Sequence, residues 1–201
     1  MKVYCINLLR RPDRWAAFTK TYTAAGLSLD DLTRFDAIDG RYLNDEHLAM
    51  FRLNPRSAKK NKQGRAACFL SHVGVIETAL RADSWPAMVF EDDVTIDKRI
   101  HEAIESRPEA DILYLGALPV QDRKRVALGH TGWAKTSVKL YGGHAYMLPN
   151  REAAERLLDF IYDHVTVFDT ALTLYQREHA APVYYPFVVK RTFGDSDIDV
   201  A

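Results

Sequence analysis

The sequence predicts an α/β fold with a single domain over residues 1–201, and three observations support it. An apolar strand at 2–8 runs within a few residues into a helix at 12–25, as at the start of many α/β domains. A second apolar strand at 87–90 follows a helical stretch at 66–82. No repeat, low-complexity tract or linker divides the chain, whose length suits one domain with a sizeable core.

The other elements follow from hydrophobic periodicity and from residues that begin or end helices. Pro12 opens the first helix and Gly26 ends it, while Asn150 caps a later helix with an apolar face. The remaining expected elements are a strand at 32–38, a short helix after 41, a helix at 97–106, a strand at 111–116, a bent strand at 138–148, helices at 151–163 and 171–177, and an extended segment at 183–189.

The charge composition argues against partners that are recruited by a strong overall field. Lys plus Arg equals Asp plus Glu at 27 each, so no net charge attracts nucleic acid or an anionic membrane. Basic residues do gather in the segment 54–63, which also contains Pro55 and is expected to be mobile. This segment either closes over an anionic substrate or is an ordinary solvated loop.

The cysteines and the apolar segments indicate the compartment. Cys5 and Cys68 lie among apolar neighbours, which predicts buried, reduced thiols rather than a disulfide. No pair of Cys and His residues has the spacing of a zinc motif. The chain turns polar after Ile6, too early for a signal peptide, and no apolar stretch is long enough to span a bilayer. We therefore expect a cytoplasmic protein without a transmembrane segment.

An acidic triplet ends the apolar strand at 87–90. Glu91, Asp92 and Asp93 are consecutive, and three carboxylates at one strand end repel one another unless a cation neutralises them. Mg²⁺ and Mn²⁺ favour carboxylate oxygens, so the triplet is a candidate metal site. Alternation along the strand places Glu91 and Asp93 on one side and Asp92 on the other. The alternative is a solvated acidic turn after a core strand.

The loop after the first strand carries Asn7, Arg10, Arg11 and Arg14. Such a loop faces the carboxyl end of the sheet, where open α/β folds bind their ligands. Arginines at this edge suit a diphosphate, because a guanidinium group can donate two hydrogen bonds to one phosphate. A solvated surface is the alternative for these arginines.

Several sequence blocks occur in a characteristic order. They are Ile6-Asn7-Leu8 with Arg14, Ala37-Ile38-Asp39-Gly40, Ala67-Cys68-Phe69-Leu70-Ser71-His72, Phe90-Glu91-Asp92-Asp93-Val94, Asp111-Ile112-Leu113-Tyr114-Leu115-Gly116, Gly143-His144-Ala145-Tyr146, Asp169 before an amphipathic helix, and Ser196-Asp197-Ile198. Together they resemble glycosyltransferase family 25, which holds lipooligosaccharide and collagen galactosyltransferases. The series covers nearly the whole chain. Arg65 departs from it, because the family usually has an acid at that place.

The resemblance implies a GT-A fold, which is one Rossmann-like domain with a mostly parallel central sheet flanked by helices. It implies a nucleoside-diphosphate-sugar donor, a UDP-hexose such as UDP-galactose, and Mn²⁺ or Mg²⁺ as cofactor. Glu91 and Asp93 would hold the metal, with His144 or Asp197 completing its coordination. The residues that would surround the donor are Asn7, Leu8, Arg14, Asp39, Ser71, His72 and Asp92.

These residues are consistent with an inverting, metal-dependent transfer. Such a reaction needs an acidic metal site, to which Asp93 belongs, and a separate carboxylate that takes the proton of the acceptor hydroxyl. Asp169, at the start of a helix, is the candidate base, and a helix N-cap is the alternative role. The expected acceptor is an oligosaccharide or a glycolipid met peripherally at a membrane, as in lipopolysaccharide biosynthesis. The alternatives are a nucleotide-sugar-binding module without turnover and a metal-dependent phosphohydrolase.

Overall fold

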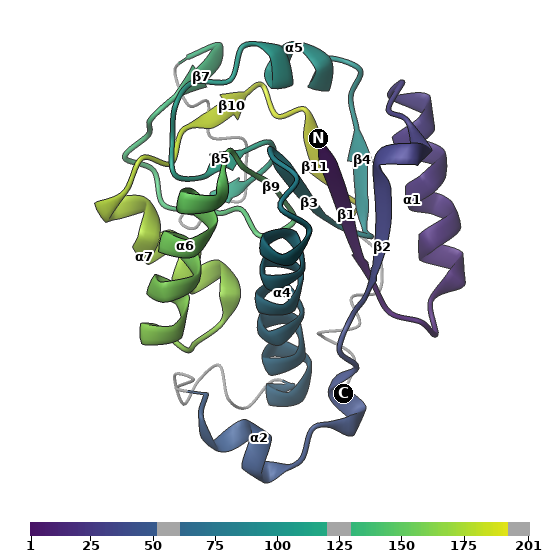
Figure 1. The fold of residues 1–201 in the computed structure, drawn as a ribbon, viewed down its shortest axis with the longest axis vertical. Coiled ribbons are helices and arrows are strands. Elements are labelled where there is room, and N and C mark those ends of the chain that lie inside the picture. The colour runs from purple at the N-terminus through teal and green to yellow at the C-terminus, as the bar shows by residue number, and fades with distance from the viewer. Residues whose placement is uncertain (52–60, 120–129, 193–201) are drawn as a thin grey trace.

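The computed structural model describes residues 1–51, 61–119 and 130–192 (Figure 1). Its centre is a seven-stranded sheet with the strand order β2-β1-β3-β9-β5-β10-β7. The pairs β1–β2, β1–β3 and β5–β10 are parallel, and β3 and β5 are both antiparallel to β9. β1, β2, β3, β5 and β10 therefore share one direction, while β9 and β7 run the opposite way. The predicted α/β fold with a mostly parallel central sheet is confirmed.

The strands of the central sheet are β1 (Lys2–Asn7), β2 (Leu32–Asp36), β3 (Ala87–Glu91), β5 (Leu113–Tyr114), β7 (Gly132–Ala134), β9 (Ala145–Leu148) and β10 (Val183–Tyr185). Two small antiparallel sheets pair β4 (Val94–Ile96) with β11 (Val189–Arg191), and β6 (Leu118–Pro119) with β8 (Leu140–Tyr141). The α-helices are α1 (Pro12–Ala24), α2 (Asp45–Ala49), α4 (Lys62–Ala82), α5 (Ile100–Glu105), α6 (Arg151–Asp163) and α7 (Phe168–Glu178), and the 3-10 helices are η1 (Leu29–Asp31) and η2 (Gly40–Tyr42).

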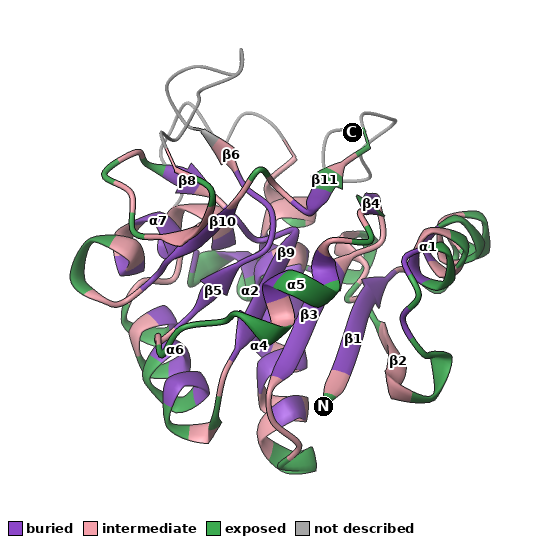
Figure 2. Cartoon of the chain, turned by 90° about the horizontal axis from the view of Figure 1, so that it is seen from above, coloured by how far each residue is buried: buried purple, intermediate pink, exposed green. Residues whose placement is uncertain are grey.

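Alternating side chains of the central strands build a hydrophobic core on each face of the sheet. In β3, Ala87 and Val89 belong to the core beneath α4, α6 and α7, whereas Met88 and Phe90 belong to the core beneath α1 and α5. Figure 2 shows β3 and β9 buried in the middle of the molecule and α1 exposed along its outer side. Burial on both faces explains why the sequence of β3 is a continuous apolar run.

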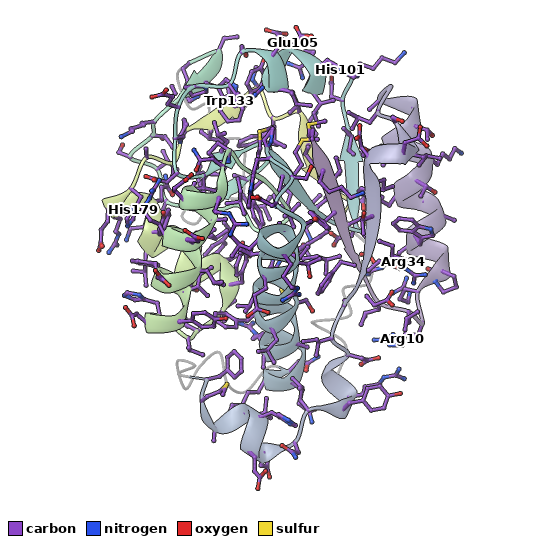
Figure 3. The ribbon with its side chains drawn as sticks, viewed as in Figure 1. Arg10, Arg34, His101, Glu105, Trp133 and His179 are labelled. Atoms are coloured by element: carbon purple, nitrogen blue, oxygen red, sulfur yellow. The ribbon has the colours of Figure 1, made fainter. Side chains whose placement is uncertain are left out.

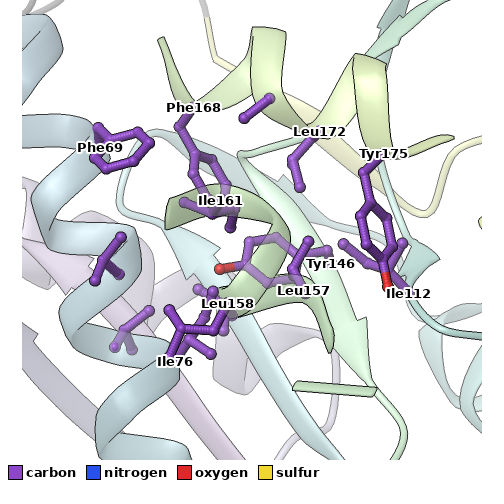
Figure 4. Close-up of a cluster of buried hydrophobic side chains, with 14 of the residues drawn as sticks. Phe69, Ile76, Ile112, Tyr146, Leu157, Leu158, Ile161, Phe168, Leu172 and Tyr175 are labelled. Carbon is purple, nitrogen blue, oxygen red and sulfur yellow. The ribbon is translucent and has the colours of Figure 1, made fainter. Parts of the chain in front are cut away.

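The core beneath α4 joins three helices to the sheet (Figure 4). Phe69 and Ile76 of α4, Ile161 of α6 and Phe168 of α7 gather around Tyr146 of β9. All of these side chains are nearly inaccessible to solvent. This packing fixes α4 and α7 against the middle of the sheet, and both helices contribute residues to the site described below.

The carboxyl ends of β1, β2 and β3 meet at one edge of the sheet because the three strands are parallel. Arg10 lies near this edge, whereas His101 and Glu105 of α5 lie at the opposite end of the molecule (Figure 3). α4 begins close to the same edge, where it contacts η2 and α2. The loops after the three strands and the start of α4 therefore surround one place.

Two elements differ from the prediction because of specific backbone contacts. α4 begins at Lys62 rather than at Ala66, since the Asn61 side chain accepts a hydrogen bond from the Gly64 N–H at 2.8 Å and caps it. The bent strand expected at 138–148 is wrong, because β8 and β9 belong to different sheets. A Cβ atom at Gly142, between them, would lie only 2.4 Å from the Tyr114 ring, so glycine is required there.

The strand expected at 111–116 is shorter in the structure, and the segment expected at 183–189 divides into β10 and β11 around Pro186.

Within residues 1–51, 61–119 and 130–192, no helix combines the length and apolar composition that a bilayer span requires.

Candidate functional site

A cavity of about 680 Å³ opens at the carboxyl edge of β1, β2 and β3. Cavities that bind small molecules and cofactors have roughly 300–1,000 Å³, so this one can hold a sizeable ligand. The predicted site residues that line it are Leu8, Arg14, Asp39, Ser71, His72, Glu91, Asp92 and Asp93. Asn7, His144 and Asp169 are described by the structure but are not part of this lining.

Asp92 is held from the side of β1 and α1. Asn7 Nδ2 donates a hydrogen bond to its Oδ2 at 2.5 Å, and Arg14 Nη1 donates to its Oδ1 at 3.2 Å. Burial raises the pKa of Asp92, although these two donors oppose the shift. Asn7 is thus outside the cavity lining but fixes the carboxylate of Asp92, which belongs to that lining.

Asp93 pairs with Arg191, a residue that the sequence analysis did not identify. Arg191 Nε donates to Asp93 Oδ2 at 2.8 Å. The pairing of β11 with β4 sets Arg191 opposite Val94, and Thr192 adds two hydrogen bonds of 2.7 Å to the Asp93 carbonyl. Burial alone would lower the pKa of Arg191, but the charges of Asp93 and Glu91 raise it. A guanidinium group therefore stays charged beside the acidic triplet.

The second oxygen of Asp93 is a candidate ligand atom. Asp93 Oδ1 is buried and has no hydrogen-bond partner within the part of the chain that the structure describes. Burying a carboxylate oxygen without a partner is costly, and a hard divalent cation would offset this cost. The Asp93 carboxylate therefore fits the cation that the sequence implies.

Glu91 faces α4 instead, on the same face of the sheet as Val89. Its Oε1 lies 3.4 Å from His72 Nε2 and 4.0 Å from Cys68 Sγ. Burial, with a further contribution from the charge of Asp93, raises the pKa of Glu91 to about 8. Burial lowers the pKa of His72 to about 3. Near neutral pH, Glu91 therefore holds its proton and His72 is neutral.

The raised pKa of Glu91 predicts a pH-dependent effect of Glu91→Gln on stability. The folded protein keeps this proton to a higher pH than the unfolded chain does, so ionisation of Glu91 destabilises the fold as pH rises from about 5 to about 8. Glutamine cannot ionise. We expect the melting temperature of Glu91→Gln, relative to wild type, to increase over this range when both are measured in chelator.

Glu105→Gln is the matched control, because Glu105 is exposed on α5 at the opposite end of the molecule (Figure 3). Its melting temperature should follow that of the wild type at every pH. A difference between Glu91→Gln and wild type that stays constant from pH 5 to pH 8 would contradict the raised pKa.

The loop after β2 is fixed on α4 by short contacts. Ser71 Oγ accepts a hydrogen bond from the Ile38 N–H at 2.9 Å and donates to the Ala67 carbonyl at 2.7 Å. A Cβ atom at Gly40 would lie 2.8 Å from the carbonyl carbon of Gln63, so only glycine allows this approach. Ser71 therefore shapes the cavity by holding the backbone of this loop.

Asp39 gathers two arginines at the same wall. Its Oδ2 accepts hydrogen bonds from Arg10 Nε at 2.9 Å and from Arg41 Nη2 at 2.7 Å. The hydrogen bond from Arg41 is the largest contribution that lowers the pKa of Asp39 to about 2. Arg10 and Arg41 both line the cavity, so Asp39 fixes two positive groups beside it.

Both cysteines are free thiols, as predicted, but only Cys5 is buried. Cys68 is partly exposed and lines the cavity, so its predicted burial is wrong. The reason is its place in the second turn of α4, which lies at the carboxyl edge of the sheet where the cavity opens. The protein atoms around the sulfur still exclude water from it, and this desolvation raises the pKa of the Cys68 thiol.

Thiol labelling is expected to separate the two cysteines. In the native protein, Cys68 should react with a maleimide slowly, because its pKa is raised, while Cys5 should react only after denaturation. Peptide mass spectrometry after timed labelling measures both rates on one sample. A ligand that fills the cavity should protect Cys68, and labelling of Cys5 ahead of Cys68 would contradict the assignment.

Asp169 lies in the first turn of α7 and is not its N-cap, a position taken by Val167. The N-cap alternative is therefore wrong. Its Oδ1 accepts a hydrogen bond from the Gly143 N–H at 2.9 Å. Burial first, and the charge of Glu91 second, raise the pKa of Asp169 to about 6. A carboxylate with this pKa has a basicity suited to proton transfer near neutral pH.

Of the two predicted third metal ligands, the structure describes His144 alone. His144 is buried, its carbonyl accepts a hydrogen bond from the Glu91 N–H at 3.0 Å, and burial lowers its pKa to about 4. Asp197 and most of the basic segment, residues 54–60, lie outside the described residues. Within the described part of the chain, the potential metal ligands that converge are Cys68, His72 and Glu91, whose ligand atoms lie within 4.8 Å of one another.

The family model described as glycosyltransferase family 25 (LPS biosynthesis protein) matches residues 1–172. The chain belongs to glycosyltransferase family 25. The resemblance that the sequence blocks indicated is confirmed.

Curated family members match over a part of their length. A rat (Rattus norvegicus) protein, named a probable inactive glycosyltransferase 25 family member 3, is 30% identical over 142 residues, which is 63% of this chain and 24% of that protein. A mosquito (Aedes aegypti) glycosyltransferase 25 family member is 27% identical over 176 residues, which is 78% of this chain and 28% of that protein. The chain thus spans about a quarter of the length of these relatives.

The galactosyltransferase LgtC, solved in complex with donor and acceptor sugar analogues, has a similar structure. The TM-score is 0.55 at 11% sequence identity, and the match covers 96% of this chain and 87% of LgtC. At this identity the likeness concerns the fold, which is therefore GT-A-like.

Sequence reasoning missed two features of this site. Cys68 and His72 are four residues apart on α4, and this spacing places them on one face of the helix. Zinc-finger motifs have different spacings, so the comparison with those motifs did not indicate this pair. Arg191 gave no local signal, because it reaches Asp93 across 98 residues of sequence.

Proposed function

We propose that this family 25 chain transfers a hexose from a nucleoside-diphosphate sugar, a UDP-hexose such as UDP-galactose, to a glycan acceptor with inversion. The observation that carries the proposal is the cavity at the carboxyl edge of a GT-A-like sheet, lined by the acidic triplet together with Arg14 and Arg191. This combination of guanidinium groups and carboxylates suits a diphosphate and the divalent cation that accompanies it.

The positive groups divide between two sides of the cavity. Arg14 and Arg191 lie beside Asp92 and Asp93, where they would neutralise charge on the diphosphate as it leaves. Arg10 and Arg41 lie beside Asp39 on the wall formed by the loop after β2. We assign the first pair to the diphosphate and the second wall, including Leu8 and Ser71, to the nucleoside.

Asp93 would hold Mn²⁺ or Mg²⁺ through Oδ1, which has no hydrogen-bond partner among the described residues. Glu91, the other ligand implied by the resemblance, faces α4 beside Cys68 and His72 instead. When bound there, the cation supplies Lewis-acid stabilisation to the departing diphosphate. Asp92 is already engaged by Asn7 and Arg14, so its part is to fix the geometry of the triplet.

Asp169 is the proposed general base. Its carboxylate accepts the Gly143 N–H through Oδ1, which orients the group, and its pKa of about 6 leaves it ionised at neutral pH. In the reaction it would accept the proton of the acceptor hydroxyl while the hydroxyl oxygen attacks the anomeric carbon. The acceptor we propose is an oligosaccharide or a glycolipid of the kind made in lipopolysaccharide biosynthesis, and the proposed location is cytoplasmic.

A second candidate is a nucleotide-sugar-binding module without turnover. The observation in its favour is that a relative matching 63% of this chain is named a probable inactive family member. This candidate uses the same cavity and the same arginines but requires no base.

Incubation of the purified protein with Mn²⁺, a panel of UDP- and GDP-sugars and oligosaccharide acceptors tests the proposal. We expect release of UDP that depends on the acceptor, together with an increase in acceptor mass by one hexose. Binding of a nucleotide sugar without any product would instead support the binding module. Release of inorganic phosphate without sugar transfer would support a phosphohydrolase and would likewise overturn the proposal.

A further inference from the structure

Three potential metal ligands of different chemistry converge on the wall of the cavity next to α4. Cys68 and His72 are one helical turn apart on α4, and Glu91 is the last residue of β3, on the face of the sheet that α4 covers. Their sulfur, nitrogen and oxygen atoms all lie within 4.8 Å of one another. A thiol, an imidazole and a carboxylate are the three side-chain types that zinc binds.

The distance between His72 and Glu91 fits a shared ion better than it fits a hydrogen bond. His72 Nε2 lies 3.4 Å from Glu91 Oε1, and Cys68 Sγ lies 4.0 Å from the same oxygen. A hydrogen bond between nitrogen and oxygen is shorter, at about 2.7–3.2 Å. Tetrahedral zinc with standard bond lengths separates a nitrogen and an oxygen ligand by about 3.4 Å, and a sulfur and an oxygen ligand by about 3.6 Å.

The His72 ring is fixed in the orientation that metal binding requires. Its Nδ1 lies 3.2 Å from the Tyr146 hydroxyl, and its ring stacks on Phe168 with the centroids 3.8 Å apart and the planes 2° from parallel. The side chain is fully buried, and its Nε2 is directed toward Glu91. Histidines that bind metals usually have the other ring nitrogen held by such a partner.

We propose that Cys68, His72 and Glu91 form a binding site for Zn²⁺, separate from the Asp93 site for a hard cation. A thiolate and an imidazole select zinc over Mg²⁺ and Mn²⁺, which prefer oxygen ligands. All three residues line the cavity, so the fourth coordination position faces it and is open to water or to a ligand oxygen. Three protein ligands with one open position are the arrangement of a reactive zinc site rather than of a purely structural one.

Cobalt provides the first test, because a bond between Co²⁺ and a thiolate gives a charge-transfer absorption in the near ultraviolet. The intact protein is stripped with chelator under reducing conditions and titrated with Co²⁺, and Zn²⁺ is then added in competition. We expect the charge-transfer band to appear with one equivalent of Co²⁺ and to disappear when Zn²⁺ displaces it. Absence of this band in the wild type would overturn the proposal.

Single variants locate the ion. Cys68→Ser should lose the charge-transfer band, and its Zn²⁺ affinity should fall by about 100-fold or more, since even loss of an outer partner of a ligand costs about 10–100-fold. Cys5→Ala is the matched control, because Cys5 is the other free thiol and lies in β1. Cys5→Ala should keep the charge-transfer band. Circular dichroism of each variant tests whether it is folded.

Two further variants separate this site from its neighbour. Tyr146→Phe removes the hydroxyl beside His72 Nδ1 and should weaken Zn²⁺ binding by about 10–100-fold while the band remains. Asp93→Asn should keep the band, because it removes none of the three proposed ligands. Loss of Zn²⁺ binding in Asp93→Asn, with full binding in Cys68→Ser, would place the ion on the acidic triplet and overturn the proposal. These readouts report binding alone, so they do not depend on sugar transfer.

Discussion

Asp93→Asn is expected to lower metal-supported sugar transfer by about 100-fold or more, which corresponds to about 3–4 kcal/mol of lost transition-state stabilisation. Asparagine preserves the size of the side chain and can still accept the hydrogen bond from Arg191 Nε. It removes the negative charge of the proposed cation ligand, whose Oδ1 has no partner among the described residues. Initial rates at several Mn²⁺ concentrations measure the effect.

The fold should survive this substitution, because it reduces repulsion within three consecutive carboxylates. Asp36→Asn is the matched control. Asp36 ends β2 at the same edge of the sheet, its side chain is 59% exposed, and it is not part of the cavity lining. Its transfer rate should stay close to that of the wild type. A wild-type rate for Asp93→Asn, or full wild-type activity in chelator, would show that Asp93 holds no essential cation.

Asp169→Asn is expected to reduce transfer by about 100- to 10,000-fold while donor binding stays nearly unchanged. Asparagine Oδ1 can still accept the Gly143 N–H, so the start of α7 should keep its geometry. What is lost is the capacity to accept a proton from the acceptor. Calorimetric titration with UDP and a product assay on the same preparation separate binding from transfer.

The pH dependence of the wild type adds an independent readout. Because the pKa of Asp169 is raised to about 6, the base is ionised above that pH and protonated below it. The value of kcat/KM should therefore fall as pH decreases through about 6, and the residual activity of Asp169→Asn should lack this decrease. Asp163→Asn, at the exposed end of α6, is the matched control. Near wild-type transfer by Asp169→Asn would exclude Asp169 as the base.

These two substitutions also test whether the chain is a transferase or a binding module without turnover, a question raised by the relative that is named probable inactive. If the chain is a binding module, both variants and the wild type bind nucleotide sugar and none forms product. If it is a transferase, the wild type forms product and the two variants lose it for different reasons. Asp93→Asn should lose the stimulation by the cation, and Asp169→Asn should lose the decrease in activity below a pH of about 6.

Local patterns in the sequence determined the class of fold and the position of the acidic triplet at the end of β3. The continuous apolar run of β3 required burial on both faces, and alternation along this strand predicted that Glu91 and Asp92 face opposite sides. The structure has them there, with Glu91 toward α4 and Asp92 toward Arg14 of α1. Helix boundaries set by single residues, such as Pro12 and the cap at Asn150, were also predictable.

Only the tertiary structure decided which distant groups meet. Arg191 reaches Asp93 because β11 pairs with β4, and Asp169 reaches Gly143 because α7 packs beside the turn before β9. No periodicity in the sequence encodes these contacts between distant residues. They depend on which strands pair in the folded protein and in which register. Burial then sets the pKa values of Glu91 and Asp169, and burial is a property of the packed molecule rather than of either residue.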